Sequence, residues 1–176
     1  MLTHSELIDR AFNWLRGSQT CAVVISELAT SASEKSDALG WKGGLSILVE
    51  AKASLSDFRA DSKKVWRRHH TDGLGVKRFY IVGPEVSDAI CKLELLPAGW
   101  GLLVCKQRGI EVREFSKTWR SNARREIDVL LSVIRRIAEN REPLKGVGVR
   151  CYIHELSNTK ENPVAALSIG LERITS

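Results

Sequence analysis

The sequence has little cysteine and no long hydrophobic run, and both shortages exclude classes of protein. It contains four cysteines, none in a Cys-x-x-Cys pair, so neither a disulfide framework nor a cysteine zinc site is expected. No apolar run approaches the roughly 18 residues of a membrane-spanning helix, and the first residues do not resemble a signal peptide. We therefore expect a cytoplasmic protein with reduced cysteines and no membrane association.

Internal repeats and low-complexity segments are absent as well, and the chain length fits one domain of about 100–200 residues. Hydrophobic residues make up 43% of the sequence, which is enough to build a core. Lysine and arginine outnumber aspartate and glutamate by 27 to 21, which gives a net charge of +6. This excess favours a polyanionic partner, although a soluble protein without such a partner can carry the same charge.

Hydrophobic periodicity predicts a mixed α/β sheet with helices packed on it. A capping-box pattern, Thr3-His4-Ser5-Glu6, begins a first helix that ends at Gly17. Strands are expected at 21–25, 37–42, 45–52 and 79–82, followed by a hairpin of 101–105 and 110–115. Further helices are expected at 55–69, 85–95 and 119–139, the last with an apolar stripe of Ile127, Leu130, Leu131, Ile134 and Ile137. Towards the end of the chain, the pattern predicts a strand over 147–153 and a final helix over 161–174.

Two acidic residues and a lysine are predicted to meet at one end of this sheet. The strand over 45–52 is apolar in its middle and ends in Glu50-Ala51-Lys52. Side chains two residues apart on a strand point to the same face, so Glu50 and Lys52 emerge side by side. Asp37, in the preceding strand or turn, supplies a second carboxylate.

These residue types suit metal-assisted hydrolysis of a phosphodiester. Mg²⁺ and Mn²⁺ prefer oxygen ligands, which Asp37, Glu50 and the carbonyl of Ala51 supply. Lys52 can orient the attacking water, neutralise charge on the phosphate oxygens, or, with a lowered pKa, act as a base. A Glu-x-Lys tripeptide also occurs by chance as an exposed cross-strand pair. The apolar strand before it, Asp37 upstream and a basic helix downstream favour a functional site here.

The helix expected after this strand carries basic residues along one side. They are Arg59, Lys63, Lys64, Arg67 and Arg68. Such a stripe can neutralise phosphates and set the register of a nucleic acid, but a solvated helix face has the same pattern. Ser54 or Ser56 is expected to cap this helix, and Asp57 and Asp61 are expected to act as dipole or hydrogen-bond partners rather than as metal ligands.

The order helix, three strands, helix, strand, with Asp37, Glu50 and Lys52 in it, resembles the PD-(D/E)XK, or restriction-endonuclease-like, superfamily. Ser36 stands where the motif name has proline, a position that often varies. The sequence is most similar to the MmcB-like bacterial DNA-repair nucleases, in which a Glu-x-Lys tripeptide precedes Ser, Asp-Phe, Asp and Lys-Trp. The matching residues here are Ser54, Asp57-Phe58, Asp61 and Lys63-Lys64-Val65-Trp66, and the resemblance covers about residues 5–115.

The resemblance implies a nuclease-like domain over 1–142 with an α-β-β-β-α-β core. Beyond it, where the resemblance has no counterpart, we expect a C-terminal helical extension over 143–176 packed on the same domain. It implies a deoxyribonuclease of DNA repair or processing that uses Mg²⁺ or Mn²⁺, with Asp37, Glu50 and Lys52 as catalytic residues. Glu27, at the end of an apolar strand, takes the place of the further acid that many members hold near the metal. The implied partner is DNA, and a homodimer is favoured because many enzymes of this fold pair to cut both strands.

Two other functions are compatible with the same sequence. A nuclease-like fold that binds nucleic acid without cutting it keeps the basic helix, but it has no need for three clustered charges. A mobile-element or phage-related protein acts instead on a protein partner, through the segment after residue 142, where no motif is recognisable.

Overall fold

The computed structural model of the protein describes residues 2–28, 36–61, 73–138 and 150–153. Its elements begin with a helix, three strands, a helix and a strand, which confirms the α-β-β-β-α-β order expected from the sequence. The elements are α1 (His4–Arg16), β1 (Val23–Ser26), β2 (Ala38–Lys42), β3 (Leu45–Lys52), α2 (Leu55–Asp61), β4 (Lys77–Val82), α4 (Pro84–Lys92), β5 (Gly101–Cys105), β6 (Ile110–Glu114), α5 (Ala123–Ala138) and β7 (Arg150–Ile153). Within these ranges, no helix has the length and apolar character needed to cross a membrane.

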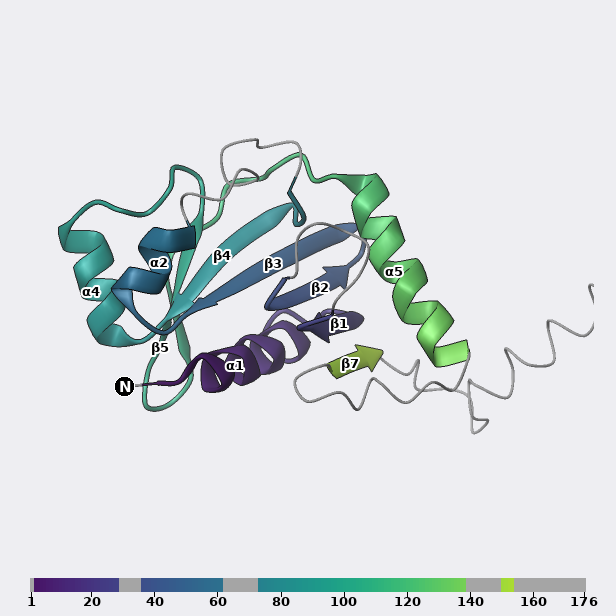
Figure 1. Cartoon of the computed structure of the whole chain (residues 1–176), viewed down its shortest axis with the longest axis horizontal. Helices are drawn as coiled ribbons and strands as arrows, with labels where there is room; N and C mark the ends of the chain where they lie inside the picture. Colours follow the sequence, from purple (N-terminus) through teal and green to yellow (C-terminus); the bar gives the residue numbers. More distant parts are fainter. Residues whose placement is uncertain (1, 29–35, 62–72, 139–149, 154–176) are drawn as a thin grey trace, which may run out of the picture.

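The described strands form one mixed sheet in the order β6-β5-β4-β3-β2-β1-β7 (Figure 1). β4 pairs in parallel with both β3 and β5, and the remaining pairs are antiparallel. Gly43 and Gly44 have φ angles of 53° and 79°, and this double left-handed conformation makes the tight turn between β2 and β3. The sheet therefore has β3 in its interior, paired on both edges.

One face of the sheet is covered by α1, whose start was predicted. The Thr3 hydroxyl accepts a hydrogen bond from the Glu6 amide, and the Glu6 carboxylate accepts one from the Thr3 amide, which completes the capping box. The helix buries an apolar side that includes Leu7, Ile8, Ala11, Trp14 and Leu15. They pack in one cluster with Ile47, Val49 and Ala51 of β3.

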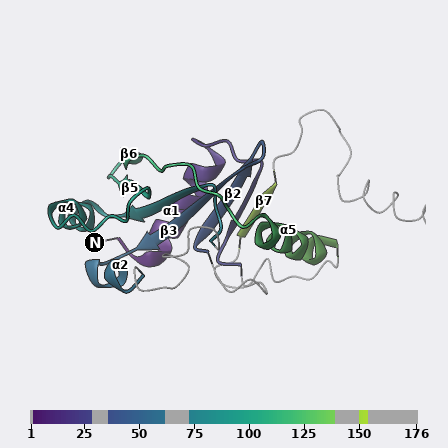
Figure 2. The same cartoon turned by 90° about the horizontal axis from the view of Figure 1, so that it is seen from above.

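The opposite face of the sheet holds a second core cluster. Its members include Leu48 of β3, Phe58 of α2, Tyr80 of β4, Ile90 of α4 and Val129 of α5. Figures 1 and 2 show α2 and α4 together at one end of the sheet and α5 at the other. Because Leu48 projects to this face, Glu50 and Lys52, two and four residues further along β3, project to it as well.

The predicted apolar face of α5 is wrong. The buried side of α5 carries Glu126, Val129 and Val133, whereas Ile127, Leu131 and Ile134 are each more than half exposed. The cause is Glu126, whose carboxylate accepts hydrogen bonds from Ser46, Gly75 and Trp41 and so turns its own side of the helix to the sheet. A buried glutamate with hydrogen-bond partners satisfies the interior as an apolar residue does, and periodicity cannot detect it.

Other boundaries differ by a few residues from those expected. β1 begins two residues later, at Val23, α4 ends at Lys92, and α5 begins at Ala123 rather than near 119. Cys21 and Cys105 are buried free thiols, as expected, while Cys91 is exposed. The second half of the helix predicted over 55–69 and the whole helix predicted over 161–174 lie outside the described residues.

Candidate active site

The start of β2 and the end of β3 bring the predicted residues to one place. β2 and β3 are antiparallel with Ala38 opposite Val49, so Asp37 comes just before β2 at the position that faces Glu50. Glu50 and Lys52 are only 2% and 4% exposed, because β3 lies between β2 and β4 and under α2. The site therefore combines buried charges with a neighbouring carboxylate at the edge of the core.

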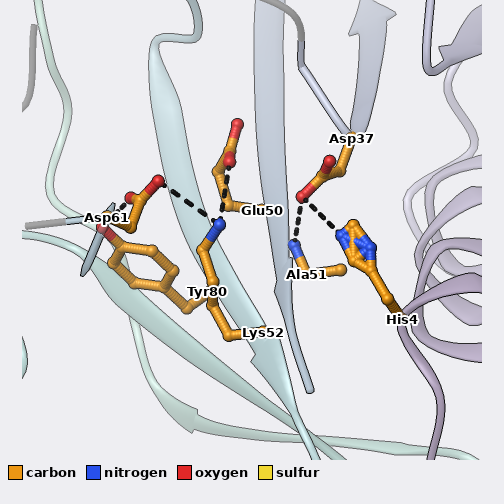
Figure 3. A network of polar contacts seen from close by, with 7 residues as sticks. All are labelled: His4, Asp37, Glu50, Ala51, Lys52, Asp61 and Tyr80. Carbon is orange, nitrogen blue, oxygen red and sulfur yellow. Dashed lines mark hydrogen bonds and ion pairs between the residues drawn. The ribbon is translucent and has the colours of Figure 1, made fainter. Parts of the chain in front are cut away.

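The ammonium of Lys52 lies between two buried carboxylates (Figure 3). Its Nζ is 3.4 Å from Oε2 of Glu50 and 3.3 Å from Oδ1 of Asp61. Oδ2 of Asp61 in turn accepts a 2.9 Å hydrogen bond from the hydroxyl of Tyr80. One polar chain thus connects β3, α2 and β4, each of which contributes at least one member.

Asp37 is held on the other side of the end of β3. Its Oδ2 accepts a 2.8 Å hydrogen bond from the amide of Ala51 and lies 3.6 Å from Nε2 of His4 in the first turn of α1. The side chains of His4 and Asp37 are 43% and 16% exposed, so the site opens to solvent on this side. The main-chain N–H of Glu27 donates to the carbonyl of Asp37, which places the backbone after β1 next to it.

The surrounding charges keep Lys52 protonated. Burial alone lowers the pKa of Lys52, but the carboxylates raise it by more, Glu50 and Asp61 most strongly and then Asp37 and Asp57. The net pKa is above the ordinary value for lysine, so the side chain is an ammonium at neutral pH. This favours a role as a positive charge over the alternative role as a base.

The donor set fits a hard divalent cation that keeps part of its water shell. Asp37 and Glu50 offer carboxylate oxygens from neighbouring positions, and the Lys52 ammonium lies within 3.4 Å of Glu50 and 3.3 Å of Asp61. Across the described ranges, no three or more His, Cys, Asp or Glu side chains gather into a group suited to hold a metal. Mg²⁺ commonly takes only one or two carboxylates and completes its shell with waters and substrate phosphate, which this arrangement allows.

Of the other predicted site residues, some lie near Asp37 and Glu50 and some lie outside the described part of the chain. Glu27 follows β1 with a positive φ of 52°, and it does not form a three-ligand group with Asp37 and Glu50. Ala51 contributes its amide to Asp37, as described above. Arg59 is exposed on α2. The basic residues Lys63, Lys64, Arg67 and Arg68 lie outside the described part of the chain.

The structure adds residues for which the sequence suggested no role in the site. Neither Tyr80 nor His4 was predicted to take part in the site. Asp61 was expected to be a hydrogen-bond partner, and its contact with Tyr80 confirms this. Ser54 caps α2 by accepting from the Asp57 amide, as predicted. A signal for Tyr80 was present, since it is the one hydroxyl within the apolar strand Phe79-Tyr80-Ile81-Val82.

A cavity of about 400 Å³ lies beside this site rather than in it. It opens between α1, the start of α4 and the turn after β5, where Arg10, Pro84 and Lys106 are among its lining residues. Ala53, which follows Lys52, also lines it, but Glu50, Lys52 and Asp61 do not. The candidate active site therefore consists of the contact network of Glu50, Lys52, Asp61 and Tyr80, together with Asp37.

Together, the fold and the site define a mixed α/β protein with a Glu-Lys-Asp cluster buried at the end of a central strand. The chain belongs to the MmcB-like family, because the family model described as "DNA repair protein MmcB-like" matches residues 3–142. The matched segment contains every residue of the site, and it confirms the closer of the two resemblances seen in the sequence. The membership associates the chain with DNA repair.

A solved structure supports the fold. The chain is similar to a protein of unknown function from Silicibacter pomeroyi, with 24% identity and a TM-score of 0.57. The alignment covers 82% of this chain and 95% of the other. At this identity the likeness shows the fold alone. No curated protein sequence matches the chain significantly.

Proposed function

We propose that the protein is a metal-dependent nuclease that hydrolyses DNA phosphodiester bonds during DNA repair or processing. The observation that carries this proposal is the buried group of Glu50, Lys52 and Asp61 with Asp37 beside it, in a chain of a DNA repair family. Burying several charges together commonly costs stability because the charges lose their hydration. Clusters of this kind are found preferentially at functional sites.

Each residue has a distinct task in this proposal. Asp37 and Glu50 supply the metal-binding carboxylates, with the carbonyl of Ala51 as a supporting donor, and Glu27 would hold a water bound to the metal. When bound, Mg²⁺ or Mn²⁺ polarises a phosphate oxygen and lowers the pKa of a coordinated water. Lys52, as an ammonium, orients the attacking water and stabilises the negative charge that develops on the phosphate oxygens.

The basic residues of the segment 55–69 hold the DNA strand in this proposal. Arg59 is exposed on α2, the same helix that carries Asp61 to Lys52. Lys63, Lys64, Arg67 and Arg68 follow Asp61 within seven residues of sequence. Phosphate contacts from such residues give affinity that falls steeply with salt and set the register of the strand without reading its sequence.

A cleavage assay tests the proposal. The protein is incubated with single-stranded, duplex and branched DNA in the presence of Mg²⁺, Mn²⁺ or a chelator. We expect metal-dependent cutting that falls by about 10²–10³-fold or more in Glu50→Gln and Lys52→Met, since each removes a group that stabilises the transition state. The controls Glu114→Gln and Lys92→Met make the same changes at exposed positions and should cut as the wild type does.

Two results would contradict the nuclease. Cutting that survives in Asp37→Asn and in Glu50→Gln would show that the chemistry lies elsewhere. DNA binding without any metal-dependent cutting, equal in the wild type and in Lys52→Met, would identify a nucleic-acid-binding protein that keeps a nuclease-like site.

A further inference from the structure

We infer that Asp61 and Tyr80 are positioning residues that hold the ammonium of Lys52 back from Glu50 and so keep the Glu50 carboxylate accessible to a divalent cation. The inference rests on the proposed metal-dependent function and adds a role for two residues that contact neither the cation nor the substrate in it. Asp61 acts through Lys52, and Tyr80 acts through Asp61.

The position of Lys52 is the first observation. Its Nζ is almost equidistant from Glu50 Oε2 and Asp61 Oδ1, at 3.4 and 3.3 Å. A hydrogen bond between an ammonium and a carboxylate that meet without competition is about 2.7–2.9 Å long. Two carboxylates therefore share one ammonium, and neither has drawn it into a close pair.

The second observation is that Asp61 is fixed from two directions. The Tyr80 hydroxyl donates to its Oδ2, while its Oδ1 faces Lys52. Phe58, three residues earlier and on the same side of α2, packs its ring 4.7 Å from that of Tyr80. The Tyr80 ring also stacks on Trp100, with the centroids 4.5 Å apart. An aromatic cluster thus anchors the carboxylate that competes with Glu50 for Lys52.

The consequence for a cation follows from electrostatics. The three side chains are 5% exposed or less, and charges attract each other strongly in such an environment. Without the charge of Asp61, Lys52 is free to close on Glu50 and occupy the oxygen that a metal requires. The ammonium and the metal then compete directly for one carboxylate.

Titration of Mn²⁺ into the protein by calorimetry tests this without relying on cleavage. In Asp61→Asn we expect Mn²⁺ affinity to fall by about 10–100-fold, the range found for residues that orient metal ligands. Tyr80→Phe keeps the ring and the Asp61 charge and removes only one hydrogen bond, so its loss should be smaller. Asp128→Asn, the same change at an exposed position of α5, is the control and should bind as the wild type does.

The double variant Asp61→Asn/Lys52→Met separates positioning from other roles. If Asp61 acts through Lys52, removing the ammonium as well returns Mn²⁺ affinity to near the value of Lys52→Met. If Asp61 were a metal ligand, a structural residue or a charge that attracts the cation directly, Asp61→Asn would lower Mn²⁺ affinity in the Lys52→Met background by about the same factor as in the wild type, which would overturn the inference.

The two proposals fail in different ways. Wild-type protein that gives no Mn²⁺ heat overturns the metal-dependent nuclease and, with it, the positioning role. Wild-type protein that binds Mn²⁺ while Asp61→Asn binds equally well overturns the positioning role alone. Urea unfolding of each variant shows whether a loss of Mn²⁺ affinity comes from misfolding. If Asp61→Asn does not fold, Tyr80→Phe is the deciding variant, and Mn²⁺ binding equal to that of the wild type in Tyr80→Phe counts against the inference.

Discussion

The two ends of β3 both carry buried polar side chains on the same face of the sheet, and they are built on opposite principles. At the start of the strand, Glu126 of α5 accepts hydrogen bonds from the Ser46 hydroxyl at 2.8 Å, the Gly75 amide at 2.9 Å and the Trp41 indole at 3.3 Å. At the end of the strand, Lys52 lies between Glu50 and Asp61. The first group is one charge among neutral donors, and the second is a group of charges.

The difference fits a structural role for the start of β3 and the proposed functional role for its end. Neutral donors directed at a single carboxylate satisfy it without competition, so the Glu126 group connects α5 to the sheet. At the other end, several carboxylates share one ammonium, and replacing such a buried arrangement by uncharged residues is often neutral or stabilising. Buried charges that do not improve stability are consistent with the proposed functional role of this end of β3.

The sharpest test of this contrast is Glu50→Gln, for which we expect the largest effect on activity and almost none on stability. Metal-dependent cleavage should fall by about 10³-fold, because the variant lacks a carboxylate that we propose binds the metal. The free energy of unfolding should stay within about 1 kcal/mol of the wild type or rise, because Asp61 still pairs with Lys52 and the negative charges repel each other less. Urea unfolding and a cleavage assay on the same preparations measure both. A large fall in the free energy of unfolding of Glu50→Gln would show that this end of β3 stabilises the fold, as the Glu126 group does.

Glu126→Ala should show the reverse pattern. Two buried donors and the partly buried Trp41 indole lose their acceptor, and we expect the free energy of unfolding to fall by about 3 kcal/mol, since each unsatisfied buried donor costs about 1–3 kcal/mol. Cleavage per folded molecule, measured at low temperature, should stay close to that of the wild type because the site is at the other end of β3. Glu114→Ala, at an exposed position of β6, is the control. Loss of cleavage in folded Glu126→Ala protein would remove the distinction between the two ends.

The same contrast explains what the sequence could predict. Local patterns were sufficient where the interacting residues are close in sequence, as in the capping box of Thr3 and Glu6. The pair Glu50 and Lys52 was also predictable, because the period of a strand places residues two apart on one face. Asp37 could be placed near them because it lies in or just before the strand that directly precedes β3.

What the sequence could not predict depends on contacts between distant residues. Glu126 meets Ser46 across 80 positions, and this contact turns α5 away from the face that its apolar residues suggest. The Tyr80–Asp61 hydrogen bond spans 19 positions and requires β4 and α2 to be packed together. Both are polar contacts inside the core, where hydrophobic patterning carries no information about the partner.

The smallest expected effect concerns pH, and it also distinguishes the two ends. The pKa of Lys52 is raised in the folded protein, so its proton stabilises the fold fully below the unfolded-state value of about 10.4, and the stabilisation is lost as the pH rises through the folded-state value. The difference in unfolding free energy between the wild type and Lys52→Met should therefore shift against the wild type as the pH rises above about 10.4. Other lysines and tyrosines are common to both proteins, so the difference isolates Lys52. The difference in unfolding free energy between the wild type and Glu126→Ala should stay constant over the same pH range, because the residues around Glu126 include no titrating lysine. An equal pH dependence for both variants would show that the charge on Lys52 does not distinguish the end of β3 from its start.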